Sequence, residues 1–205
     1  MLVPLVRLPR WFENLESRHG PAMLVAASGL LRATAEDGTV VEASLPLGRA
    51  YDGPPDVAAL ADAAATPLAW GILLVRKGGF AVAAVEGEAI VASKVGQRHV
   101  QGRTKAGGQS QQRFARRRDN QARQAYEAAA GHAHRILVLG SAAPAALVCG
   151  GDRSAVDAVL ADARLSQLSV VRTDPWLAVP DPRRSVLEQA VSDALSVSMT
   201  IVEPE

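Results

Sequence analysis

The sequence contains one cysteine and very few aromatic residues. A lone cysteine, Cys149, cannot form an internal disulfide or a four-thiolate zinc site, which excludes a disulfide-stapled secreted fold and a cysteine-rich zinc finger. Because Cys149 lies in an apolar run, we expect its thiol to be buried and unreactive. Aromatic residues make up only 4% of the chain. We therefore expect a core built mainly from Ala, Val and Leu side chains.

Long hydrophobic runs are also missing. Apolar stretches such as residues 68–75 and 136–139 fall far short of the roughly 20 residues that a membrane-spanning helix needs. Residues 1–10 show no apolar block followed by a cleavage site, so no signal peptide is predicted. With 48% hydrophobic and 21% charged residues over 205 positions, the composition is typical of a folded chain rather than a disordered one. We expect a soluble, cytoplasmic protein with no membrane partner.

The net charge of +1 conceals a separation of charge along the chain. Nine basic side chains and one acidic side chain give residues 94–123 a charge of +8, which leaves −7 for the rest of the sequence. A cationic segment on an acidic body favours nucleic acid as a partner, because each phosphate contact releases counterions. The same run is also compatible with a solvated helix face that binds nothing.

Turn residues and apolar patterning divide the sequence into two predicted units. Residues 1–62 predict a small α+β region with a helix over residues 10–19 and a hairpin that turns at residues 36–38. A stretch rich in proline and glycine follows. Residues 66–205 predict an α/β domain whose mixed sheet carries helices on its faces.

The second unit begins with a predicted antiparallel meander, formed by residues 68–75, 80–85 and 89–95. A long loop comes next, and then a helix from Ser110 that Gly131 is expected to end. Alternating strands and helices after Gly131 predict parallel pairing in the second half of the sheet. These elements are expected at residues 135–139 (strand), 145–149 (apolar run), 154–164 (helix), 168–171 (strand) and 185–197 (helix).

The basic segment holds the most informative motif in the chain. It contains Gly107-Gly108-Gln109-Ser110, followed two residues later by Arg113-Phe114-Ala115-Arg116 and then by Arg118. This combination closely resembles the Gly-Gly-Gln loop and the following helix in the middle domain of eukaryotic and archaeal class 1 release factors. The resemblance covers about residues 67–171. With no room for a codon-reading domain or a GTPase-binding domain, the sequence is most similar to the Vms-like release factors, a family of peptidyl-tRNA hydrolases, in a compact bacterial, actinobacterial form.

The resemblance implies a stop-codon-independent hydrolase that releases nascent chains from stalled ribosomes or large subunits. Gln109 would position water at the peptidyl-transferase centre, and Gly107 and Gly108 would let the backbone approach RNA closely. Basic side chains around the motif would bind RNA phosphates. These are Lys94, Arg98, Arg103, Lys105, Arg113, Arg116, Arg117 and Arg118. The implied partners are the large ribosomal subunit, ribosomal RNA and peptidyl-tRNA, without DNA, cofactor or metal.

Other interpretations of the same residues stay open. A glycine- and glutamine-rich loop without chemistry would make the protein a non-catalytic ribosome- or RNA-binding module. A ribonuclease would use the same basic surface, although the loop has no carboxylate cluster for metal ions. Gln111 is a rival for the catalytic glutamine, but the match at residues 113–116 favours Gln109. His132 and His134 lack partners at metal-binding spacing, so we expect no metal site there.

Overall fold

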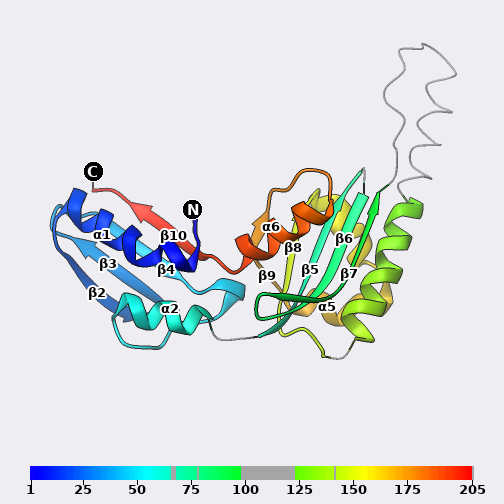
Figure 1. The fold of residues 1–205 in the computed structure, drawn as a ribbon, viewed down its shortest axis with the longest axis horizontal. Helices are drawn as coiled ribbons and strands as arrows, with labels where there is room; N and C mark the ends of the chain where they lie inside the picture. Colours follow the sequence, from blue (N-terminus) through cyan, green and yellow to red (C-terminus); the bar gives the residue numbers. More distant parts are fainter. Residues whose placement is uncertain (66–67, 78, 98–122, 141, 205) are drawn as a thin grey trace, which may run out of the picture.

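A computed structural model shows two five-stranded sheets with helices packed against them (Figure 1). The structure describes residues 1–65, 68–77, 79–97, 123–140 and 142–204. The first unit contains β1 (Leu2–Val3), η1 (Leu5–Arg7), α1 (Leu8–His19), β2 (Ala22–Ala27), β3 (Leu30–Ala35), β4 (Val40–Ser44), η2 (Pro46–Gly48), α2 (Val57–Ala65) and β10 (Val197–Val202). The second contains β5 (Ala69–Arg76), β6 (Gly79–Glu86), β7 (Ala89–Gln97), a helix over residues 123–133, the π-helical turn η3 (His134–Val138), β8 (Leu147–Gly151), α4 (Arg153–Leu160), η4 (Ala163–Leu165), α5 (Ser166–Val170), β9 (Arg172–Leu177) and α6 (Arg184–Ala194).

The first sheet is antiparallel and has the strand order β1-β10-β4-β3-β2. Strand β10 lies between β1 and β4, although the whole second unit separates it from them in sequence (Figure 1). Helices α1 and α2 cover one face of this sheet, where Leu8, Phe12 and Leu60 are buried. Residues 197–202 were expected in the second unit, whereas the structure pairs them with strands of the first sheet. The division into two domains stays a prediction.

An unpredicted reversal divides the first arm of the expected hairpin. Ser28 and Gly29 have φ values of 54° and 80°, and the chain turns back there from β2 into β3. The turn predicted at residues 36–38 is present between β3 and β4, and Gly38 has a φ of 90°. Ser-Gly is a turn dipeptide, and both residues adopt the positive φ of a two-residue hairpin turn, so the sequence carried a signal that the prediction of one long arm overlooked.

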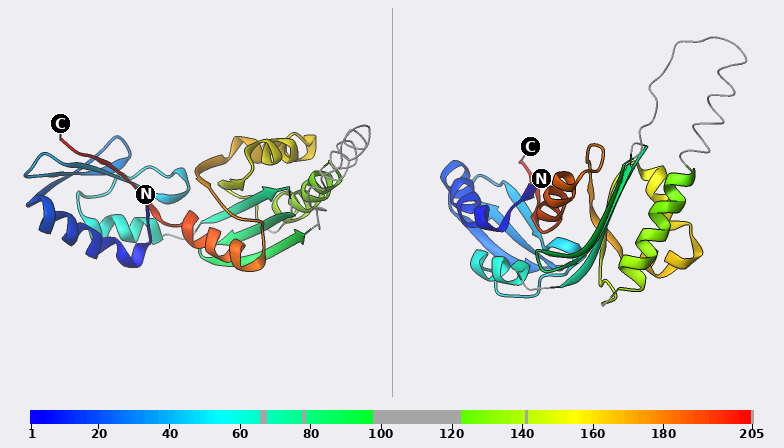
Figure 2. Two further views of the ribbon diagram at one scale, coloured as in Figure 1. Left: turned by 90° about the horizontal axis from the view of Figure 1, so that it is seen from above. Right: turned by 45° about the vertical axis from the view of Figure 1, so that its right-hand side comes forward.

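The second sheet has the strand order β7-β6-β5-β8-β9. Its first three strands form the predicted antiparallel meander, and the pairs β5–β8 and β8–β9 are parallel, as predicted. The helix over residues 123–133 packs on one face with α4 and α5, and α6 packs on the opposite face (Figure 2). The predicted fold class is therefore confirmed as α/β, with a mixed sheet between helices and a smaller N-terminal α+β region.

Two predicted strands are helical in the structure. Residues 135–139 were expected to form a strand, but the preceding helix continues through Gly131 into η3. Residues 168–171 were also expected to form a strand, but α5 occupies most of them and β9 follows from Arg172. Short apolar runs do not distinguish a buried helical turn from a buried strand. Leu137 in the first segment and Leu168 in the second are buried in the core.

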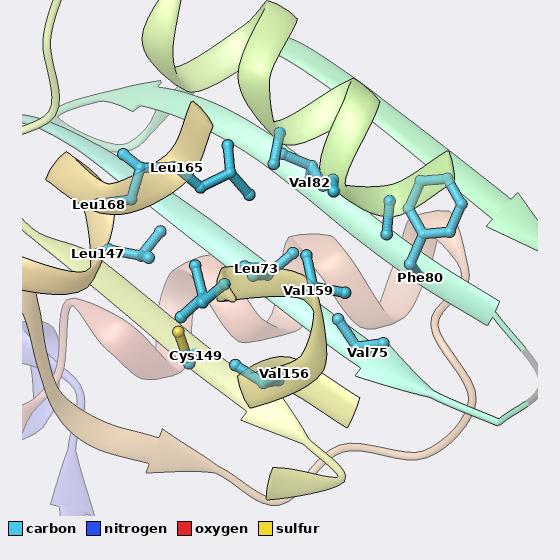
Figure 3. Close-up of a cluster of buried hydrophobic side chains, with 14 of the residues drawn as sticks. Leu73, Val75, Phe80, Val82, Leu147, Cys149, Val156, Val159, Leu165 and Leu168 are labelled. Atoms are coloured by element: carbon cyan, nitrogen blue, oxygen red, sulfur yellow. The ribbon is translucent and has the colours of Figure 1, made fainter. Parts of the chain in front are cut away.

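The core on the face of α4 is made mostly of aliphatic side chains (Figure 3). Cys149 of β8 lies among them near Val156, and it is buried as predicted. Burial raises the pKa of its thiol to about 12, so the thiol is protonated near neutral pH. Within the described residues, none of the helices combines the length and the apolar character needed to cross a membrane.

Candidate nucleic-acid interface

Most of the predicted site lies in residues 98–122, outside the described residues. This applies to the predicted catalytic residues Gly107, Gly108 and Gln109, and to Arg98, Arg103, Lys105, Arg113, Arg116, Arg117 and Arg118. Lys94 is the predicted RNA-binding residue that the structure describes, and it is exposed on β7. The site is therefore described through the two elements on either side of residues 98–122.

The flanking elements are β7, which ends at Gln97, and the helix that is described from residue 123. Strand β7 is one of the two edge strands of the second sheet, and its final residue, Gln97, pairs with Gly79 at the start of β6. The last residues of β7 and the first described turn of the helix lie at the same end of the sheet (Figures 1 and 2). Both elements belong to the packed body of the second unit.

Phe80 of β6 contacts both flanking elements. Its ring lies over Gly96 of β7, where an added Cβ would come within 2.6 Å of the Phe80 Cζ atom. The same ring faces the imidazole of His132, with centroids 5.5 Å apart and an interplanar angle of 30°. Phe80 therefore packs between the end of β7, which precedes residues 98–122 in sequence, and the helix that follows them.

Small side chains let the helix approach the sheet closely. Ala129, Ala130 and Ala133 are buried against the second sheet. Leu137, one turn further on, lies over Gly71 of β5, and a Cβ on Gly71 would be 2.9 Å from the Leu137 Cδ2 atom. Such close packing holds the helix in one position, because side chains of this size leave little room for rearrangement.

Two basic side chains, Arg135 and Lys94, act on the His132 ring that faces Phe80. Arg135 donates from Nη2 to Nδ1 of His132 over 2.8 Å. Burial, Arg135 and Lys94 together lower the pKa of His132, so its imidazole is neutral near pH 7. Since Nδ1 accepts this hydrogen bond, we assign the ring proton to Nε2.

Sequence reasoning missed Phe80, His132 and Arg135 as parts of one arrangement. It considered His132 only as a metal ligand, and it assigned Arg135 to a strand. Within the described ranges, no group of three His, Cys, Asp or Glu side chains is placed to hold a metal ion. The sequence signal that could have indicated the contact between His132 and Arg135 was their spacing, since residues three apart face the same side of a helix.

Comparison with known proteins places the second unit in a protein family. Residues 68–200, well over half of the chain, match the family described as Actinobacteria/chloroflexi VLRF1 release factor. No curated protein matches the chain. Among solved structures, one described as "Vms1 mitochondrial localization core" is similar, with 10% sequence identity and a TM-score of 0.42 over 98% of this chain and 82% of that one. The family match spans both flanking elements and the segment between them.

Proposed function

Because the chain belongs to the VLRF1 release factor family of Actinobacteria and Chloroflexi, we propose that it is a peptidyl-tRNA hydrolase that releases nascent chains without reading a stop codon. Family membership gives it a release-factor role in quality control at the ribosome. The proposed substrate is peptidyl-tRNA on a stalled ribosome or large subunit, in the cytoplasm. The observation that carries the proposal is the Gly107-Gly108-Gln109 motif within the region that matches the family.

The proposed reaction is hydrolysis of the ester between the nascent chain and tRNA. A water molecule attacks the ester carbonyl carbon, the bond to the ribose oxygen breaks, and a free carboxylate and a tRNA hydroxyl result. This reaction requires a water molecule held in line with the carbonyl and donors for the developing oxyanion. Gln109 offers a backbone N–H and a side-chain amide that both donates and accepts. Gly107 and Gly108 permit backbone conformations that other residues disfavour.

Basic side chains supply the proposed contacts to ribosomal RNA and to tRNA. Lys94 projects from the exposed edge strand of the second sheet, beside the start of the segment that carries the other proposed contacts. Contacts of this kind position a protein on RNA without selecting a base sequence. They fit an activity that depends on the state of the ribosome rather than on a codon.

A peptide-release assay tests the proposal. The purified full chain is added to stalled complexes that hold radiolabelled peptidyl-tRNA, and the released peptide is measured. We expect release by the wild type and a loss of at least about 100-fold in Gln109→Ala, the scale seen when one positioned donor is removed. Binding measured by cosedimentation should be retained. Gln111→Ala is the matched control and should release peptide normally.

The alternative is a non-catalytic ribosome- or RNA-binding module. It predicts no release by the wild type, together with binding that charge reversal at Arg116 and Arg117 abolishes. Unchanged release by Gln109→Ala would also reject the assignment of the catalytic residue. Gel analysis of the tRNA 3′ end separates ester hydrolysis, which leaves the RNA intact, from cleavage by a nuclease.

A further inference from the structure

We propose that Lys94, His132 and Arg135 form an additional RNA-phosphate contact on the folded body of the second unit. This inference rests on the proposed function and deepens it, because it adds two residues that sequence reasoning did not connect with RNA. The chemistry recognised is the anionic oxygen of an RNA backbone phosphate. The phosphate belongs either to ribosomal RNA or to tRNA, and the experiment below separates these sources.

The sheet register brings the three side chains to one side of the molecule. Lys94 pairs with Val82, and two residues further on Gly96 pairs with Phe80. Residues two apart on a strand face the same side of a sheet. Lys94 therefore projects from the face on which the Phe80 ring contacts His132.

Packing fixes the position of the His132 imidazole. The Phe80 ring faces it, and the buried alanines of the same helix hold the backbone against the sheet. The hydrogen bond from Arg135 Nη2 to His132 Nδ1 in turn orients the guanidinium. His132 is thus a positioning residue for Arg135, and its own Nε2–H is a further donor. A guanidinium held in this way keeps most of its N–H groups available for a bidentate phosphate contact.

Among the described residues, no acidic side chain forms an ion pair with this basic group of Lys94, His132 and Arg135. In the same unit, Arg164 is paired with Asp162 at 2.7 Å and Arg172 with Asp157 at 2.8 Å. Grouping like charges without a counter-charge opposes folding, whereas a bound phosphate would offset the repulsion. The chain therefore carries here the features of a polyanion contact rather than those of a surface ion-pair network.

The salt dependence of binding measures this contact directly. Affinity of the full chain for vacant large ribosomal subunits is recorded between 50 and 300 mM KCl, for the wild type, Lys94→Gln and Arg135→Gln. The logarithm of affinity falls with the logarithm of salt concentration by roughly 0.7 to 0.9 for each phosphate contact. We expect each substitution to weaken binding and to make this slope shallower by about that amount.

Matched variants separate a phosphate contact from a structural role. Arg135→Lys keeps the charge and should keep most of the slope. Arg164→Gln, whose guanidinium is already held by Asp162, should leave the slope unchanged. Thermal unfolding of each variant verifies that it is folded. Unchanged slopes in folded Lys94→Gln and Arg135→Gln would overturn the inference.

A second titration identifies the source of the phosphate. Free deacylated tRNA replaces the ribosomal subunits, and the same variants are compared. A shallower slope only with subunits assigns the contact to ribosomal RNA, and a shallower slope with free tRNA assigns it to tRNA. Peptide release is measured separately from binding. If Gln109→Ala loses release while Lys94→Gln and Arg135→Gln keep the wild-type salt slope, the proposed function is retained and this phosphate contact is rejected.

Discussion

Gly96 in β7 lies against the ring of Phe80 in β6, and no side chain fits at that position. A Cβ at residue 96 would be 2.6 Å from the Phe80 Cζ atom, well inside van der Waals contact. Phe80 is buried, and its ring also faces His132. A displacement of this ring would therefore reach the helix that follows the predicted site.

We expect Gly96→Ala to destabilise the protein by about 1 to 3 kcal/mol, the range for forcing an extra carbon into a packed core. Urea unfolding measures the loss. Because the substitution shifts both elements that flank residues 98–122, peptide release should fall as well, even where the protein is still folded. An unchanged unfolding midpoint would show that the Phe80 ring moves aside without cost.

Gly131→Ala is the matched glycine substitution and should have the opposite effect. Gly131 lies inside a helix, and apart from its chain neighbours and the backbone of that helix no described atom is within 4 Å of a Cβ built at this position. Replacing a helical glycine with alanine reduces the entropy of the unfolded chain at no steric cost. We expect the free energy of unfolding to rise by about 0.5 to 1 kcal/mol, measured in the same urea titration. A loss of stability would contradict the helical assignment of this residue.

Truncation should cost more in the first half of β10 than near its end, although Met199 and Ile201 point to the same face of the sheet. Met199 is 1% exposed in the core of the first sheet, whereas Ile201 is 44% exposed. Met199→Ala should cost about 2 to 5 kcal/mol, as for other buried methionines and leucines. Ile201→Ala should cost far less, because its side chain is already partly hydrated. Thermal or urea unfolding of both variants checks the difference, and similar losses would contradict the decrease in burial from Met199 to Ile201 along β10.

Cys149 should resist thiol reagents in the folded protein. The thiol is 1% exposed, and its pKa of about 12 leaves almost no thiolate at pH 8. We expect no reaction with Ellman's reagent under native conditions and one thiol per chain after unfolding in guanidinium chloride. Rapid native labelling would show that β8 opens readily to solvent.

Acidification should destabilise the fold through His132. Its folded-state pKa is lowered, so the unfolded chain takes up a proton first as the pH falls. Stability is then lost below the ordinary histidine pKa of about 6.5, and the loss ends once the folded state also binds the proton. We expect His132→Gln to show a smaller decrease in unfolding free energy between pH 7.5 and 5.5. An equal decrease in both proteins would remove His132 as the cause.

Local patterns in the sequence predicted much of the second unit. Apolar runs separated by turn residues gave the β5–β6–β7 meander, and alternation of strands and helices gave the parallel pairs with β8 and β9. The resemblance to the Vms-like release factor family is also confirmed by the match over residues 68–200. These features depend on residues that are close in sequence or on one distinctive motif.

What the sequence did not predict depends on contacts between distant residues. In the π-helical turn at His134–Val138, Leu137 packs into the core beside Gly71. No residue pattern within this segment predicts a π-helical turn. Similarly, the Phe80–His132 contact forms only once the helix packs on the sheet. Lys94 was predicted as an RNA-binding residue from the local charge and from the resemblance to release factors, whereas the surroundings of Arg135 depend on His132, Phe80 and the sheet together.

The position of β10 between β1 and β4 in the first sheet couples folding to the direction of translation. Strands β1 to β4 emerge from the ribosomal exit tunnel early, but β1 has no partner in the sheet until residues 197–202 follow. During elongation, the edge of β4 that β10 later covers presents unpaired backbone N–H and C=O groups. Other strands or other chains can form hydrogen bonds with such an edge. A circularly permuted chain that begins between α2 and β5, with a short linker from the C-terminus to the N-terminus, would place β10 directly before β1 and would remove this delay.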